Sequence, residues 1–197
     1  TDSMKTMLKN VPLFLLILLL TVGCLSLPTG DEEPTPWVLR YSFDDPNWRD
    51  YIWRQPGEAT VTDVDGVQAA QRQQPKNESW GWVGAIINNP VEIFDENMVL
   101  RVTWRVDCET RTTCNRVQAL VYYSGSVPRK INLDSQGGQF STNEWHVSEI
   151  RLTNYEEFPV GAMVHRVDIS EEHKKTDSFI SLAAIEFAIV EPEEGEE

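Results

Sequence analysis

From residue 37 onward, apolar and polar side chains alternate with a period of two, and this alternation constrains the fold more than any other feature of the sequence. It is clearest over residues 98–107, where the apolar positions are Met98, Leu100, Val102, Trp104 and Val106. Such alternation predicts a strand with one buried face, whereas a helix needs a period of 3.6. No later segment shows a helical stripe, so the chain is expected to be all-β.

Turn signals separate the alternating segments. Asp65-Gly66 lies between residues 59–64 and 67–71 and is a strong signal for a two-residue hairpin. Further strands are expected over residues 80–87, 130–134, 145–152 and 163–169. Residues 179–190 are apolar on both faces, as expected of a central buried strand. About nine strands with turns between them favour an antiparallel β-sandwich.

Two cysteines lie between the strands expected at residues 98–107 and 117–123. Cys108 and Cys114 flank a five-residue loop, which in an oxidising compartment predicts a disulfide at the base of a hairpin. A metal pair is the alternative, but four ligands are usual for structural zinc and no nearby residue completes the set. Matching the buried faces requires a bulge near the disulfide, with Trp104 close to Val117.

The N-terminus has the layout of an export signal. Residues 1–3 are expected to lie upstream of the natural start at Met4, and Lys5 and Lys9 precede the apolar run 13–20. This run falls short of the roughly 20 apolar residues that span a membrane.

Residues 20–24, Leu-Thr-Val-Gly-Cys, resemble the lipobox of prokaryotic lipoproteins, although Thr21 stands where that family usually has Leu. The resemblance implies that Cys24 is acylated and becomes the first mature residue. An uncleaved anchor or an ordinary signal is the alternative. Each of these places the rest of the chain outside the cytoplasm.

The sequence therefore divides into a signal peptide (1–23), a lipidated cysteine with an acidic, proline-rich tether (24–36), a β-sandwich domain (37–191) and an acidic tail (192–197). Proline-rich linkers are extended and semi-rigid, so the tether would hold the domain away from the membrane.

Charge excludes one class of partner. The chain has 31 acidic and 17 basic residues, a net charge of −14, whereas a general nucleic-acid binder needs a cationic surface. The expected partners are a membrane, through the lipid anchor, and a carbohydrate or another surface protein.

The opening segment 41–48, Tyr-Ser-Phe-Asp-Asp-Pro-Asn-Trp, and the closing segments 145–152, 165–169 and 181–187 resemble the galactose-binding-like jelly rolls of carbohydrate-binding modules. The resemblance implies an antiparallel jelly-roll β-sandwich that binds sugar. Such modules often hold structural calcium through an Asp in the last strand, where this chain has Glu186. No cofactor is therefore expected, and Asp44 and Asp45 are only weak calcium candidates.

Aromatic residues in polar surroundings are the main candidates for stacking against sugar rings. Trp48, Tyr51 and Trp53 lie among charged residues, and Trp80 and Trp82 share a strand face. The polar positions of the two strands around the cysteines form either a binding floor or a solvated outer face. The candidate sugar-binding residues are Trp48, Tyr51, Trp53, Trp80, Trp82, Arg101, Gln118 and Tyr122.

No catalytic constellation is evident, so a binding protein is expected rather than an enzyme. The three histidines are scattered, and no nucleophile elbow or phosphate-binding loop occurs. The nearest acidic cluster is Glu92, Asp95 and Glu96, and its spacing does not match the carboxylate pair of a glycoside hydrolase. Asp95-Glu96-Asn97 is interpreted as a turn. The alternative function is a subunit of a surface assembly, which an exposed apolar strip or an unpaired edge strand would favour. Asn77-Glu78-Ser79 matches a glycosylation sequon.

Overall fold

The computed structural model of the protein describes residues 38–54, 59–74, 80–109, 112–114, 116–124, 127–133, 140–172 and 177–190. Contacts divide the chain into two units, Thr1–Thr35 and Pro36–Glu197, and all the described residues belong to the second unit. Within the described ranges, no helix is both long and apolar enough to cross a membrane.

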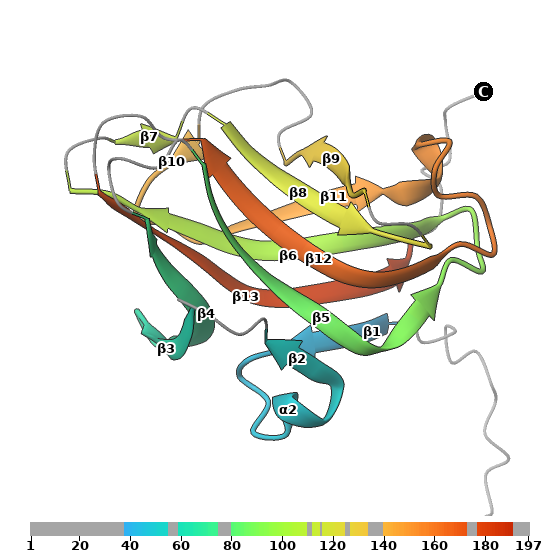
Figure 1. Ribbon diagram of the computed structural model, residues 1–197, viewed down its shortest axis with the longest axis horizontal. Coiled ribbons are helices and arrows are strands. Elements are labelled where there is room, and N and C mark those ends of the chain that lie inside the picture. The colour runs from blue at the N-terminus through green and yellow to red at the C-terminus, as the bar shows by residue number, and fades with distance from the viewer. Residues whose placement is uncertain are drawn as a thin grey trace, which may run out of the picture. The chain divides into compact units, whose positions relative to one another are not determined.

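The described residues form two packed antiparallel sheets, which confirms the expected β-sandwich (Figure 1). Sheet A has the order β11-β6-β13-β4-β3, and β1 also pairs with β13. Its strands are β1 (Val38–Ser42), β3 (Thr60–Val64), β4 (Val67–Gln74), β6 (Met98–Asp107), β11 (His146–Arg151) and β13 (Ser178–Ile189).

Sheet B has the order β2-β5-β12-β8-β9. Its strands are β2 (Ile52–Arg54), β5 (Trp80–Glu92), β8 (Arg116–Tyr122), β9 (Arg129–Asn132) and β12 (Met163–Glu172). The remaining elements are a small pair, β7 (Thr113–Cys114) and β10 (Phe140–Ser141), a short helix α2 (Trp48–Tyr51) and a 3-10 turn η1 (Leu152–Asn154).

The hydrophobic core lies between the two sheets. Trp104 and Leu182 contribute to it from sheet A, and Val121 and Ile169 contribute from sheet B, all fully buried. As predicted, β13 is central, because β6 pairs along one of its edges and β4 and β1 pair along the other.

β13 pairs with both β4 and β1 along one edge, and a bulge lies between these two pairings. Residues 178–182 pair with β4 and residues 184–188 pair with β1, and the register against β6 shifts between Leu182 and Ala184. At this point the Ala183 carbonyl accepts a hydrogen bond from the Phe43 N–H at 3.1 Å. Extra residues of this kind bend a strand and redirect its pairing.

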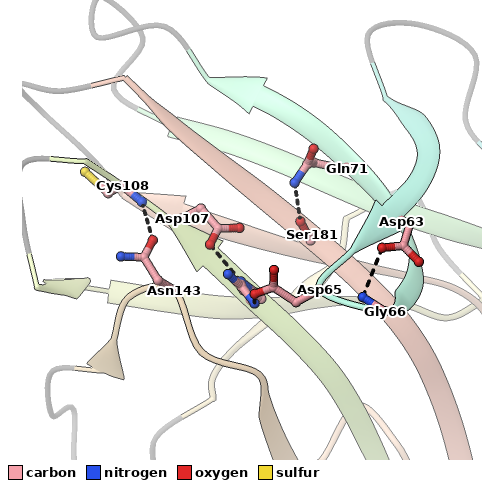
Figure 2. Close-up of polar contacts among 9 residues, drawn as sticks. Asp63, Asp65, Gly66, Gln71, Asp107, Cys108, Asn143 and Ser181 are labelled. Atoms are coloured by element: carbon pink, nitrogen blue, oxygen red, sulfur yellow. Dashed lines mark hydrogen bonds and ion pairs between the residues drawn. The ribbon is translucent and has the colours of Figure 1, made fainter.

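The predicted hairpin at Asp65-Gly66 is confirmed. β3 and β4 pair up to Val64 and Val67, and the two turn residues have φ of 51° and 83°. Positive φ at both central positions defines the type I′ turn that matches strand twist. The Asp63 Oδ1 accepts the Gly66 N–H at 2.9 Å and closes the turn (Figure 2).

β5 extends beyond the end predicted at residue 87. It continues to Glu92, but its register against β12 is irregular between Ile86 and Val91, opposite the shift between Val164 and Arg166. Pro90 falls within this interval. Because proline has no N–H to donate, it is tolerated in a strand only where the ladder is interrupted.

The hairpin predicted from residues 98–107 and 117–123 is wrong. β6 pairs with β13 and β11 in sheet A, whereas β8 pairs with β12 and β9 in sheet B. The two strands contribute their apolar faces to the same core from opposite sides. Alternation showed correctly which side chains are buried, but it does not identify the neighbouring strand.

The expected bridge between Cys108 and Cys114 is not present in the structure, since the described residues contain no disulfide. Both side chains are buried. Without the hairpin, other contacts hold this segment: Cys114 pairs with Phe140 of β10, and the Cys108 N–H donates to Asn143 Oδ1 at 3.0 Å (Figure 2).

Candidate ligand-binding face

The outer face of sheet B gathers polar and aromatic side chains from three adjacent strands. Pairing aligns Arg166 with Tyr122, Asp168 with Gly84, and Ser170 with both Trp82 and Gln118. The alternate residues Val167 and Ile169 point into the core. We call the outward positions of β5, β12, β8 and β9 the sheet B face; its described side chains are Trp82, Ile86, Arg116, Gln118, Leu120, Tyr122, Lys130, Asn132, Arg166, Asp168 and Ser170.

Arg166 is the centre of this face. Its Nε and Nη2 donate to the two carboxylate oxygens of Asp168 at 2.7 and 2.5 Å. Its Cζ lies 4.5 Å from the centroid of the Tyr122 ring and 5.3 Å from that of Trp82. Both distances are within the range of cation–π attraction. One arginine therefore connects two aromatic rings and a carboxylate.

Asp168 lies beneath this group with only 1% of its surface exposed. Burial raises the pKa of its carboxyl above the usual value, while hydrogen bonds from Arg166 and from the Tyr122 hydroxyl act in the opposite direction. Burial and the charge of Asp168 likewise raise the pKa of the Tyr122 phenol. The carboxylate organises two of the side chains that reach the surface.

A glycine makes room for this carboxylate. A Cβ at Gly84, the residue paired with Asp168, would lie 1.7 Å from Asp168 Oδ1. No side chain larger than hydrogen fits there unless the carboxyl moves. Gly84 is therefore part of the geometry that holds Asp168 against Arg166.

Trp82 is the exposed ring of the face, with 37% of its surface accessible. Arg72 of β4 also lies over its ring, at 5.7 Å from the centroid. The preceding residue, Gly81, is buried, and a Cβ there would lie 1.8 Å from Gln74 Oε1. The Gln74 amide is itself buried, with no hydrogen-bond partner among the described residues.

Gln118 adds an amide two strands away from Trp82. Its Nε2 donates to Asn132 Oδ1 of β9 at 2.9 Å. The sheet B face thus offers ring faces, guanidinium and amide N–H groups and amide oxygens. Together these suit a ligand with apolar faces and many hydroxyls.

Trp48 is buried and is not the exposed stacking surface that the sequence predicts. It is 9% exposed, in edge contact with Phe43 at 5.3 Å between centroids, and Arg49 covers its ring at 4.3 Å. Helix α2 directs this indole into the core, which the polar neighbours in sequence did not indicate. Burial is the commoner state of tryptophan.

Three other predicted aromatic residues are described only through their backbones. Tyr51 ends α2, Trp53 pairs with Ile86 in sheet B, and Trp80 pairs with Glu172 at the start of β5. Their side chains lie outside the described part, as do Cys24 and Asn77.

Arg101 does not belong to this site. It lies on sheet A, where it pairs with Glu149 and Glu186 at 2.9 Å each. Also on that face, Arg105 pairs with Asp65 and Asp107 at 2.5 and 2.7 Å. The polar positions of the two strands around the cysteines, Arg101, Thr103 and Arg105 on one and Gln118 and Tyr122 on the other, therefore do not form one face, because the two strands lie in different sheets.

Weaker candidates have local structural roles. Asp44 and Asp45 accept backbone N–H groups of Gln68 and Asn47. No group of three or more metal-ligating residues occurs in the described ranges. Asp95 accepts the Asn97 N–H at 2.7 Å, which confirms the turn predicted there.

The sequence analysis did not identify two central residues of the face, Arg166 and Asp168, as site residues. The segment His165–Ile169 was interpreted only as a strand. An Arg and an Asp two residues apart in a strand share a face, and that spacing was the available signal.

No protein-family model matches the sequence, and no curated protein matches it. Several solved structures resemble the fold. A mutant of a family 29 carbohydrate-binding module has a TM-score of 0.47 at 12% identity, covering 78% of this chain and 92% of its own. The mannan-recognising carbohydrate-binding module TmCBM27 has a TM-score of 0.45 at 14% identity, covering 80% and 99%.

The protein PfGH50B has a TM-score of 0.51 at 9% identity over 72% of this chain, but the match covers only 23% of PfGH50B. At these identities the similarity concerns the fold alone.

Proposed function

We propose that this chain is a carbohydrate-binding protein and that the sheet B face is its binding surface. The observation that carries the proposal is Arg166, held by a buried Asp168 beside two aromatic rings, Tyr122 and Trp82. Sugar rings have apolar faces that pack on aromatic side chains, while their hydroxyls need polar partners. Arg166 on β12 and Gln118 on the adjacent strand β8 supply such partners.

The remainder of the proposal rests on the sequence. Residues 1–23 direct export, Cys24 carries the lipid, and residues 24–36 tether the domain outside the cytoplasm. The ligand is then a polysaccharide or surface glycan near the membrane. The domain binds its ligand without cleaving it.

A second candidate is a subunit of a surface assembly, which one observation favours. Phe94, Val160 and Met163 are all exposed and come from segments joined by hydrogen bonds between Ile93 and residues 161–162. Clustered exposed apolar side chains are a feature of protein-binding surfaces.

Calorimetric titration of the full chain with polysaccharides, in detergent, tests the proposal. Trp82→Ala should weaken binding while Phe94→Ala, which removes an exposed ring beyond the end of β5, should not. If wild type binds no polysaccharide and Phe94→Ala instead disrupts association with envelope proteins, the assembly role replaces the proposal.

Two further experiments address the anchor and the absence of catalysis. Cys24→Ala should abolish labelling by a radioactive fatty acid and release the protein from the membrane fraction. Prolonged incubation with a bound polysaccharide should liberate no reducing ends. Retained labelling in the variant, or steady release of reducing ends, would contradict the corresponding statement.

A further inference from the structure

Exposed apolar side chains gather at one end of the sandwich, where β1, β6 and β12 begin and β5, β8 and β13 end (Figure 1). Five of the eight large apolar side chains that are exposed in the described ranges lie there, whereas Trp82 and Phe179 lie toward the opposite end. Single exposed apolar residues are common, but a cluster marks an interaction surface. We call these five residues the apolar end: Val38, Phe94, Val127, Val160 and Met163.

Backbone hydrogen bonds hold the segments of the apolar end side by side. The Ile93 N–H donates to the Ala162 carbonyl at 2.9 Å, and the Gly161 N–H donates to the Ile93 carbonyl at 2.7 Å. These bonds bring the turn that carries Phe94 against residues 160–163. The apolar side chains are therefore presented by paired backbone of the folded domain.

The segment before β12 also reaches the start of β9. The Arg129 guanidinium pairs with Glu157 at 2.9 Å and lies over the Tyr155 ring, 5.2 Å from its centroid. Val127, two residues before Arg129, is the most exposed of the five apolar residues, at 74%. The apolar end therefore extends from the turn after β5 to the turn between β8 and β9.

The chain enters the domain at this same end. Val38 is the first residue of β1 and pairs with Ala188, near the end of β13. Thirteen residues separate Val38 from Cys24, the proposed site of the lipid. A proline-rich segment extends by about 3.1 Å per residue, so this length reaches about 40 Å at most. The anchor would therefore keep the apolar end within reach of the membrane.

Carboxylates border the apolar end and restrict the lipid that it can meet. Glu92 lies opposite Met163, and Glu96 and Glu156 are exposed in the adjoining turns. Negative side chains are repelled by a membrane surface rich in anionic lipids. Apolar side chains are stabilised at the boundary between headgroups and acyl chains. A zwitterionic lipid surface therefore fits this end better than an anionic one.

We propose that the apolar end docks on the membrane surface, against zwitterionic lipid, and so sets the direction in which the sheet B face is presented. This inference rests on the lipid anchor of the proposed function. Trp82 lies ten residues before Glu92 along β5, which at about 3.3 Å per residue places it about 30 Å from the docked end. The sheet B face stays open to a polysaccharide, because docking uses the end of the sandwich.

Spin labels on single introduced cysteines test the docking. The full chain, purified with its lipid and reconstituted into phosphatidylcholine vesicles, carries the label at Val160→Cys or, as the matched control, at Phe179→Cys near the opposite end. Cys108 and Cys114 are buried, and acylated Cys24 does not react with the label. Oxygen concentrates in the bilayer, whereas a nickel chelate stays in water. The ratio of oxygen to nickel collision rates should rise several-fold at Val160→Cys on reconstitution and stay unchanged at Phe179→Cys.

A charged side chain at the docked end should reverse this effect. Val160→Glu, measured with a label at Val127→Cys, should lower the oxygen-to-nickel ratio several-fold, because burial of a carboxylate among apolar groups is unfavourable. Phe179→Glu, the control near the opposite end, should leave the ratio unchanged. Neither position lies on the sheet B face, so both variants should keep their affinity for polysaccharide. Replacing part of the phosphatidylcholine with phosphatidylglycerol should also lower the ratio, and an increase would contradict the role of the carboxylates.

The outcomes separate this inference from the proposed function. If Cys24 carries no acyl group and the chain does not bind vesicles, the anchor fails and the docking fails with it, whereas sugar binding stands. If the anchored chain shows both labels equally exposed to the nickel chelate, the tether holds the domain away from the membrane and the docking is refuted. If the label at Val160→Cys is shielded in native envelope membranes but not in lipid vesicles, a protein covers the apolar end, which also refutes the proposal.

Discussion

Each outer face of the sandwich has an arginine paired with one or more carboxylates, and the two faces differ in the solvent exposure of the paired side chains. On sheet A, Arg101 lies between Glu149 and Glu186, with side chains 34%, 47% and 20% exposed. On sheet B, Arg166 is bonded to Asp168, with side chains 17% and 1% exposed. The same residue types thus form a solvated group around Arg101 and a group with a buried carboxylate around Arg166.

The difference has an energetic consequence. Exposed ion pairs contribute roughly 0–1 kcal/mol, because water solvates the separated charges almost as well. A buried charge that loses its partner has no such alternative. The Arg166 pair and the Arg101 pairs therefore differ in whether the carboxylate is buried, and this difference predicts different effects of the same substitutions.

The largest effect is expected from truncating the two arginines. Arg166→Ala should lower the free energy of unfolding by about 3–5 kcal/mol, because it leaves Asp168 buried without its counter-ion. Arg101→Ala should cost no more than about 1 kcal/mol. Urea denaturation of both variants measures the difference. Equal losses would show that the two faces do not differ in the way described.

A double variant sharpens this result. Arg166→Leu combined with Asp168→Leu removes both charges and should recover most of the stability lost in Arg166→Ala. The double variant should not bind sugar, because it lacks both the Arg166 guanidinium and the Asp168 carboxylate that holds it. Recovery of binding in this variant would exclude Arg166 from the site.

A smaller effect, on affinity, should distinguish the exposed and buried indoles. Trp82→Ala should weaken polysaccharide binding by about tenfold to a hundredfold with a modest change in stability. Trp48→Ala should mainly destabilise the fold, because that ring packs on Phe43. Calorimetric titration and thermal melting of each variant separate the two effects. Loss of affinity in folded Trp48→Ala alone would move the site to α2.

The smallest effect concerns pH. Burial raises the pKa of Asp168, so this group contributes stability at low pH that is lost as the pH rises through the folded-state pKa. Affinity should change in the opposite direction, since a protonated carboxyl no longer pairs with Arg166. We expect polysaccharide binding to weaken as the pH falls through the folded-state pKa of Asp168. Protonation of Asp168 should not itself destabilise the fold. Asp168→Asn should show no such pH dependence, and retention of the full dependence would assign it to another group.

The sequence predicts where the strands lie better than it predicts which strands pair with one another. The Asp65-Gly66 hairpin and the central position of residues 179–190 depend on local turn chemistry and on burial of both faces, which are visible in one segment. The partner of β6 depends on contacts with residues 146–151 and 178–189, far away along the chain. Alternation contains no information on that choice.

The site was predicted in part for the same reason. Trp82, Gln118 and Tyr122 were candidates from residue type and alternation, and they lie on one face. Arg101 matched the same pattern but belongs to the other sheet. Asp168 could not be assigned a role without knowing that Gly84 lies beside it and leaves space for its carboxyl.

The most direct test is to map the bound ligand onto the two faces by NMR. Backbone amide shifts of the full chain in detergent would be recorded with and without a soluble uncharged oligosaccharide. Perturbations should concentrate on β5, β8 and β12, around Trp82, Gln118, Tyr122 and Arg166. Perturbations confined to β6, β11 and the solvated group around Arg101, in a protein that binds the oligosaccharide, would contradict the assignment of the sheet B face.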